Sequence, residues 1–365
     1  MKTNAGVKVM ASPDNFDRAA ALKEFDEAKT GVRGIFESGA TTLPPIFRHP
    51  VLRPRSSSPS SVSVPTIDLS LPRPDAVALA SAAARDWGFF QVVNHNLPLF
   101  DRTISAVRAF HEQPPSVRSA FYSRSPEGGV SYSSNVDLYR SSAASWRDTI
   151  QLVMGPTPPD PARIPPVCRE ELLAWDEHVV KVGRELMGLL SEGLGADAGL
   201  LEGMSCLEGR VMVCHYYPPC PEPESTVGLA EHTDPGVLTV LVQDSVGGLQ
   251  IKWKQDDGEF VWVDVHPVPG ALVINVGDLL QIMSNDTYKS VEHRVLASSH
   301  QQARVSIATF FNPGKRGESV FYGPLPALVS PDKPAKYRNF TMTEFMGTFF
   351  KGQLASRSLV EHFKL

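Results

Sequence analysis

The chain of 365 residues has the composition of an ordinary globular protein, 42% hydrophobic and 21% charged. Its formal net charge of −5 argues against nucleic-acid binding, which normally requires a basic face. No run approaches eighteen consecutive apolar residues, and residues 1–23 lack a secretory apolar core, so we expect neither a membrane span nor export. Four cysteines without zinc-pair spacing predict reduced thiols in a cytoplasmic protein rather than a disulfide scaffold.

The N-terminal part is predicted to be an arm, residues 1–49, joined by a Ser/Pro-rich linker, residues 50–63, that has too little apolar surface to pack. Apolar residues among charges predict a helix over 18–30, which Gly31 and Gly34 end. The rest of the protein should fold without the arm, but apolar arm residues need a partner surface. We therefore expect four of them to dock on the body of the protein: Ile35, Phe36, Ile46 and Phe47.

Residues 64–208 form the next predicted region, which mixes strands with helices. Its expected elements, in chain order, are a strand at 64–69, a helix at 74–86, a strand at 87–94, a helix at 99–112, an irregular or strand-like segment at 125–156 and a helix at 169–194. The last helix carries apolar residues at steps of three and four from Val179 onward, which is one helical face.

Residues 209–315 change to short β-rich runs separated by Pro, Gly and Asp turns. The predicted strands are 210–217, 237–243, 248–254, 260–265, 271–275, 289–296 and 304–311. Regular short strands of this kind predict a sandwich or a barrel, without choosing between them. The remaining region, residues 316–365, ends in a predicted helix over 341–364 that would lie over the mouth of the barrel.

Two histidines and one aspartate form the most informative pattern in the chain: His232-Thr233-Asp234, followed downstream by His293. Two imidazoles and a carboxylate are the ligand set of a facial triad that leaves open positions on Fe(II). Side chains two apart in a strand point to the same face, so His232 and Asp234 can grip one metal, while His293 comes from another predicted strand. A lone H-x-D recurs by chance, so the pattern depends on its companions.

Arg304 and Ser306 follow eleven residues after His293, again two apart. A guanidinium can hold a carboxylate through two hydrogen bonds, and the hydroxyl adds a third. By itself Arg-x-Ser usually describes a solvated strand edge. In this order and in a β-rich frame, the set predicts an open iron site with a carboxylate clamp nearby.

Several longer motifs resemble those of plant 2-oxoglutarate/Fe(II)-dependent dioxygenases. The matching segments are Tyr216-Tyr217-Pro218-Pro219-Cys220-Pro221, His232-Thr233-Asp234, Gly247-Gly248-Leu249-Gln250, Asn275-Val276-Gly277-Asp278, Ser290-Val291-Glu292-His293-Arg294, Arg304-Val305-Ser306, and, earlier, residues 64–69 and 87–95. Residues 25–34 and Trp146-Arg147-Asp148-Thr149 are similar to the branch of aminocyclopropanecarboxylate oxidase homologues, which includes benzoxazinoid-glucoside dioxygenases of grasses.

This resemblance implies a mainly β fold with flanking helices around a double-stranded β-helix (jelly roll) core. It implies that His232, Asp234 and His293 bind Fe(II), and that Arg304 and Ser306 hold the distal carboxylate of the cosubstrate 2-oxoglutarate. By the same family pattern, the Tyr217 hydroxyl contacts the cosubstrate. His215 stands where many relatives carry Asn, so it either shapes the cosubstrate pocket or is an ordinary packed residue. O2 is the oxidant and ascorbate an expected activator, and Asn275 and Asp278 are interpreted as structural.

The implied reaction is the oxidation, in the first place hydroxylation, of a small plant specialised metabolite, with release of succinate and CO2. Five residues map to the substrate pocket of relatives, each with ordinary core packing as the alternative: Thr149, Gln151, Val213, Phe310 and Asn312. Phe310 could stack on an aromatic or indolic substrate. We expect a monomer with neither nucleic acid nor membrane as partner.

Two other functions remain open. True aminocyclopropanecarboxylate oxidase makes ethylene and consumes ascorbate, but that enzyme begins almost directly at the 64–69 type of strand, so the arm and linker argue against it. A non-catalytic jelly-roll sensor of small molecules would not need an intact triad beside Arg304 and Ser306.

Overall fold

The computed structural model describes residues 16–49, 62–96, 100–125, 127–255, 257–299, 301–314, 317, 319–352 and 358–365. Nearly all of the predicted linker, residues 50–63, lies outside these ranges, as does the middle of the predicted C-terminal helix. None of the described helices is long and apolar enough to cross a membrane. All four cysteines are buried and unpaired, as expected.

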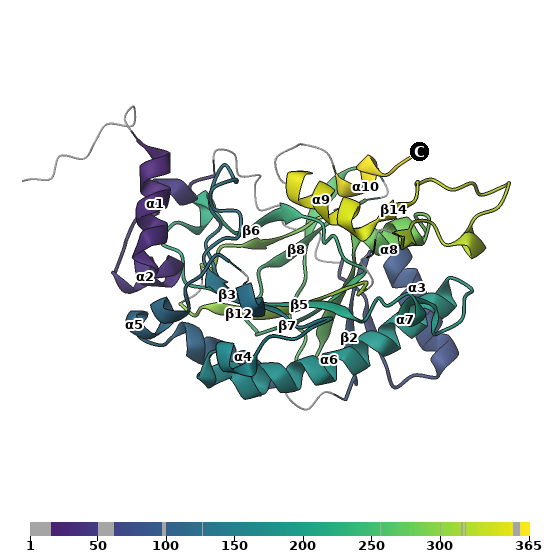
Figure 1. Cartoon of the computed structure of the whole chain (residues 1–365), viewed down its shortest axis with the longest axis horizontal. Coiled ribbons are helices and arrows are strands. Elements are labelled where there is room, and N and C mark those ends of the chain that lie inside the picture. Colours follow the sequence, from purple (N-terminus) through teal and green to yellow (C-terminus); the bar gives the residue numbers. More distant parts are fainter. Residues whose placement is uncertain are drawn as a thin grey trace, which may run out of the picture.

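The core of the protein is a pair of facing sheets, shown in Figure 1. The larger has eight strands in the order β1 (Thr66–Asp68), β2 (Phe89–Val93), β10 (Leu272–Val276), β7 (Leu238–Gln243), β12 (Arg304–Asn312), β5 (Gly209–Tyr217), β4 (Asp148–Val153) and β3 (Val130–Ser133). The smaller has four, in the order β6 (Val227–His232), β11 (His293–Leu296), β8 (Leu249–Lys254) and β9 (Phe260–Asp264). This is the double-stranded β-helix (jelly roll) that the family resemblance implies.

Three helices cover the outer face of the larger sheet (Figure 1): α3 (Arg73–Asp86), α4 (Phe100–His111) and α6 (Pro166–Gly193). Pro166 stands in the first turn of α6, where its missing N–H costs no hydrogen bond. Leu172, Val179 and Leu186 lie on the buried face of α6 at the predicted helical spacing. This face packs on apolar residues of the sheet and forms the main core with them.

Shorter elements complete the fold. They are α5 (Pro115–Arg118), α7 (Leu200–Gly203), α8 (Asp278–Met283), α9 (Met342–Gly352), α10 (Leu359–His362), the strand pair β13 (Phe321–Tyr322) and β14 (Phe340–Thr341), and six 3-10 turns, η2 (Pro45–Phe47), η3 (Ser119–Phe121), η4 (Glu127–Gly129), η5 (Pro161–Arg163), η6 (Pro223–Ser225) and η7 (Pro326–Leu328). The predicted helix over 341–364 therefore corresponds to α9 and α10.

The arm packs on one edge of the molecule through α1 (Arg18–Ala28), α2 (Gly31–Glu37) and η2. Of the four side chains expected to dock, Ile46 and Phe47 are buried and Ile35 is partly buried against the same cluster. The prediction is wrong for Phe36, which is 39% exposed and lies under the Arg33 guanidinium. The predicted stop at Gly34 is also wrong, because that residue lies inside α2.

The first turn of α2 binds the carboxylate of Asp148, the first residue of β4. Oδ1 accepts a hydrogen bond from Val32 N and Oδ2 one from Arg33 N, each at 2.8 Å, and Ser134 Oγ also donates to Oδ1. Gly31 has φ +69°, and a Cβ there would lie 2.5 Å from Asp148 Oδ1, so only glycine fits. The arm is thereby joined to the strand beside the site described next.

Candidate active site

Three side chains converge between the sheets. His232 is the last residue of β6 and pairs across the ladder with His293, the first residue of β11. Asp234 lies beyond the end of β6, so the expectation that it shares a strand with His232 is wrong; the loop turns its carboxylate back toward both rings. Asp234 Oδ1 is 3.6 Å from the Nε2 atom of each histidine.

The histidine rings are held so that Nε2 is the free atom. Nδ1 of His232 lies 2.8 Å from the Ala230 carbonyl, and Nδ1 of His293 lies 3.2 Å from the Val291 carbonyl. Each carbonyl accepts a hydrogen bond from Nδ1–H, which leaves the lone pair of Nε2 free for a ligand. Burial, and then the neighbouring His293, lowers the pKa of His232 to about 4, so the ring is in the neutral form that metal binding requires.

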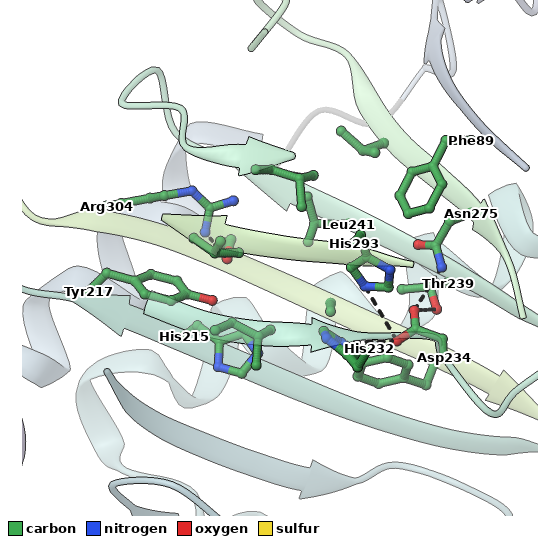
Figure 2. A pocket seen from close by; sticks show the side chains of 17 residues that line it. Phe89, His215, Tyr217, His232, Asp234, Thr239, Leu241, Asn275, His293 and Arg304 are labelled. Atoms are coloured by element: carbon green, nitrogen blue, oxygen red, sulfur yellow. Dashed lines mark hydrogen bonds and ion pairs between the residues drawn. The ribbon is translucent and has the colours of Figure 1, made fainter. Parts of the chain in front are cut away.

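Asp234 is fixed through its second oxygen, Oδ2. Thr239 Oγ1 donates to Oδ2 at 2.6 Å, and Asn275 Nδ2 donates at 2.7 Å (Figure 2). Burial opposes ionisation, but the two histidines and these hydrogen bonds outweigh it and hold the carboxyl pKa below its usual value. Oδ1 is left facing the histidines as a charged ligand atom. Asn275, which the sequence assigns to the frame, thus also orients a site residue.

The loop that carries Asp234 is tied to the start of α8. Asp278 N donates to the Asp234 carbonyl at 2.7 Å, and Thr233 Oγ1 donates to Asp278 Oδ2 at 3.0 Å. A Cβ on Gly277 would lie 2.1 Å from the Gly236 carbonyl oxygen, so this approach also requires glycine. The Asn-Val-Gly-Asp segment supports the ligand loop, and Asn275 in addition lines the cavity and binds Asp234.

Arg304 lines the same cavity, which is partly open to solvent and has about 440 Å³ of empty space, open solvent included (Figure 2). Its Nη1 donates to Ser306 Oγ at 2.9 Å and its Nη2 to Gln243 Oε1 at 2.8 Å, and its guanidinium stands 5.0 Å from the Tyr217 ring centre. No carboxylate of the described residues pairs with it, although it is 1% exposed. A buried cation of this kind calls for an anionic ligand.

Buried polar atoms without hydrogen-bond partners mark where that ligand fits. Arg304 Nε, Tyr217 Oη and Gln243 Nε2 all lack a partner within the described structure. Two histidines and one aspartate whose ligand atoms lie within 4.8 Å of one another are a donor set suited to Fe(II). The residues present therefore fit both an open iron site and a carboxylate-bearing cosubstrate.

Comparison with known proteins gives the family. The model of the 2OG-Fe(II) oxygenase superfamily matches residues 208–313, and that of the non-haem dioxygenase N-terminal region, described from morphine synthesis, matches residues 64–171. The 1-aminocyclopropane-1-carboxylate oxidase homolog 1 of Arabidopsis thaliana is 45% identical over 340 residues, covering 90% of this chain and 92% of that protein. The chain belongs to the 2-oxoglutarate/Fe(II) oxygenase superfamily. It is an enzyme, a 2-oxoglutarate-dependent dioxygenase that uses Fe(II).

Solved oxygenases of the same fold agree with this assignment. The crystal structure of JOX2 in complex with 2OG, Fe and JA matches with a TM-score of 0.80 and 34% identity, covering 92% of this chain and 97% of that one. The dioxygenase for auxin oxidation in rice matches with a TM-score of 0.66 and 28% identity, covering 83% and 100%. These two neighbours are thus described with small molecules, JA and auxin.

The expected cosubstrate residues come together in this oxygenase. Cross-strand pairing places Thr149, His215, Ser306 and Gln243 in one row across β4, β5, β12 and β7. His215 Nδ1 lies 2.9 Å from Thr149 Oγ1, and both His215 and Tyr217 line the cavity. His215 therefore faces the site, which was one of the two alternatives for it.

The expected substrate residues are brought together only in part. Phe310 lines the cavity, whereas Thr149, Gln151, Val213 and Asn312 do not. Gln151, Val213 and Ala308 form the next row across the sheet, on the face that His215 and Ser306 also share. Ala308 lines the cavity, whereas Gln151 and Val213 lie beside it in the same row without forming its wall.

Three residues that the sequence does not single out support the site: Gln243, Thr239 and Phe89. Gln243 binds Arg304, Thr239 binds Asp234, and Phe89 places its ring edge-on to His293 with centroids 5.2 Å apart. Phe89 belongs to the Trp-Gly-Phe-Phe motif of the family, which is the one signal that could have found it. The contact of Gln243 with Arg304 arises from the pairing of β7 with β12, and that of Thr239 with Asp234 from the turn between the ligand loop and β7.

Proposed function

We propose that His232, Asp234 and His293 hold Fe(II), and that Arg304, Ser306, Tyr217 and His215 receive 2-oxoglutarate, for the hydroxylation of a small plant specialised metabolite. The observation that carries this proposal is the facial set of ligands in one cavity with a buried, acid-free Arg304. Bound Fe(II), with 2-oxoglutarate and O2, supplies oxidising chemistry that converts the cosubstrate to succinate and CO2.

The residues of the chain contribute binding, orientation and exclusion of water. Arg304 and Ser306 offer two donors to the distal carboxylate, and Tyr217 Oη offers a third. Thr239 and Asn275 keep Asp234 ionised and aimed at the metal position. Apolar side chains of the wall limit water around the reacting carbon; they are Phe89, Leu229, Leu241, Leu249, Val273, Val295 and Phe310.

The substrate is placed on the side of the cavity lined by Phe310 and Ala308, next to Gln151 and Val213 in the same row of the sheet. An aromatic or indolic ring can stack on Phe310. Thr149 and Asn312 flank this side on β4 and β12. A relative crystallised with JA and a relative that oxidises auxin support a small organic substrate.

The test is incubation of a plant metabolite extract with the protein, Fe(II) and 2-oxoglutarate, with and without ascorbate. We expect succinate in proportion to a metabolite that gains one oxygen atom. Loss of a methyl or of two hydrogens in place of that gain would revise hydroxylation to demethylation or desaturation.

The two other functions predict different products. Ethylene from aminocyclopropanecarboxylate, with no need for 2-oxoglutarate, would identify the oxidase. Metabolite binding without succinate formation would identify a sensor. Neither is favoured by a cavity that offers an unpaired arginine to a dicarboxylate.

A further inference from the structure

Arg147 is a second buried arginine near the cavity, and it has no acid partner. The residue is 8% exposed, and its Nε and Nη1 atoms are fully buried without a hydrogen bond. Its Nη2, which likewise has no partner among the described residues, is left as the accessible nitrogen. Burying an unpaired charge lowers the stability of the fold. A buried cation without a partner is therefore explained if a ligand supplies the missing negative charge.

The segment around Arg147 is held rigidly on both sides. Trp146 N donates to the Val227 carbonyl at 2.8 Å, its Nε1 donates to the Pro218 carbonyl at 3.2 Å, and Phe47 of the arm packs edge-on against its ring. Asp148 is held by the first turn of α2. The guanidinium therefore projects from a fixed backbone, which is what preorganised binding needs.

Arg147 directly precedes the strand that carries Thr149. Asp148, the first residue of β4, points to the arm, so the next residue, Thr149, points to the opposite face. Thr149 contacts His215, which lines the cavity. Burial, and then the charge of Arg147, holds the pKa of His215 well below its usual value, so that charge acts at the cavity wall.

The charges of the loaded site leave Arg147 unbalanced. Asp234 and Arg304 carry opposite charges, ligating histidines bind metal in the neutral form, and the two charges of Fe(II) balance the two of 2-oxoglutarate. One positive charge, that of Arg147, remains. It is matched if the molecule to be oxidised is a monoanion.

We propose that Arg147 binds the carboxylate of the molecule that the enzyme oxidises, so that this dioxygenase acts on small aromatic carboxylic acids. The inference rests on the proposed function of the cavity and adds the substrate class to it. Phe89 and Phe310 in the cavity wall supply the apolar surface for the ring, and the accessible Nη2 supplies the first donor for the acid. Arg147 is thus a specificity-determining residue.

Binding of acid and amide pairs tests the proposal on the full chain with Fe(II) and 2-oxoglutarate under anaerobic conditions. The probes are phenylacetate, 3-phenylpropanoate and indole-3-acetate, each against its amide, with dissociation constants from equilibrium dialysis. At least one acid should bind about tenfold or more tightly than its amide, the size expected for a charged hydrogen bond. Arg147→Met should abolish the preference and Arg147→Lys should retain part of it, with 2-oxoglutarate affinity unchanged in both.

Thermal unfolding without ligand separates this role from a structural one. Arg147→Met should leave the melting temperature unchanged or raise it, because it removes a buried charge that has no partner. The control is Arg118→Met: Arg118 is also buried but pairs with Glu37 at 2.7 Å, so its loss should lower the melting temperature. An equal fall for Arg147→Met would make Arg147 structural and overturn the proposal.

Other outcomes are equally decisive. No acid preferred over its amide, or a preference that survives in Arg147→Met, would overturn the proposal. Weaker 2-oxoglutarate binding in Arg147→Met, with the acid preference intact, would assign the arginine to the cosubstrate. Failure of the wild type to bind 2-oxoglutarate in the presence of Fe(II) would instead refute the proposed function itself.

Discussion

Strand β12 has two faces that are equally buried but chemically opposite. Val305, Ile307 and Phe311 face the helices and join the main apolar core. Arg304 and Ser306 alternate with them and face the cavity, each only 1% exposed. Burial alone therefore does not distinguish core from site. The outer face stabilises the fold, whereas the inner face buries polar groups whose partners are ligands, and so trades stability for binding.

The strongest test removes a ligand from the inner side. Each of three variants should abolish succinate formation, because a site with three protein ligands cannot spare one: His232→Ala, Asp234→Ala and His293→Ala. The circular dichroism spectrum of each variant should remain that of the folded protein. Glu231→Ala, an exposed neighbour on β6, is the control and should retain activity. Turnover near the wild-type rate in any of the three would contradict the ligand assignment.

Adjacent residues of β12 allow the faces to be compared directly. Ile307→Ala should lower the free energy of unfolding by about 2–5 kcal/mol, since it opens a cavity in the packed outer core. It should leave the KM for 2-oxoglutarate unchanged. Ser306→Ala should show the reverse, a raised KM with little loss of stability. Urea unfolding and the KM for 2-oxoglutarate are measured for both variants. Equal changes in stability and in KM for the two variants would contradict the distinction between the two faces.

Arg304→Lys probes the inner face while keeping its charge. Lysine lacks the planar fork that can donate twice to a carboxylate, so we expect a loss of about 1.5–3 kcal/mol in 2-oxoglutarate binding. The KM for 2-oxoglutarate should rise more than the KM for the main substrate. An unchanged dependence on cosubstrate would exclude the carboxylate clamp.

His111 is a titratable side chain buried on the outer side, and we expect its replacement to change stability least at neutral pH. It is fully buried in α4, stacked on Tyr216 at 4.9 Å between ring centres. Burial, and then the charge of Arg118, lowers its pKa to about 3. The unfolded chain takes up a proton below about pH 6.5 and the folded chain does not, so stability falls as the pH drops from that value toward 3.

His111→Phe should therefore flatten the pH dependence of unfolding. At pH 4 the wild type should have lost roughly 3 kcal/mol through this one residue, and none at pH 7. Denaturant unfolding at both pH values measures the difference. A wild-type slope retained in the variant would assign acid sensitivity to other groups.

The sequence predicts best what depends on regular alternation. The strands β5, β7 and β12 and the helix α6 fall within about three residues of their predicted bounds, because apolar spacing marks them. β6 was not predicted, since its residues Gly228, Ala230 and Glu231 show no apolar alternation. α8 has six residues and is set by contacts of the ligand loop rather than by its own pattern.

In the candidate site, too, some features can be predicted from the sequence and others cannot. Motifs predict the metal triad and the Arg304 clamp, and the structure brings these residues together. The position of Asp234 beyond its strand and the contact of Gln243 with Arg304 depend on loop path and strand register, which the sequence does not state. Arg147 appears in the sequence only as part of a motif. Its lack of a partner is visible only when every neighbour is placed.

The hydrogen bonds between the first turn of α2 and the Asp148 carboxylate have a consequence for the order in which the chain folds. The bonds from Val32 to Asp148 and from Arg33 to Tyr216 span 116 and 183 residues. During synthesis the arm is made before both of its partners, so its apolar residues lack this packing surface until Tyr216 has been added. Docking of the arm is thus a late step of folding, although the arm itself is made before the sheet that receives it.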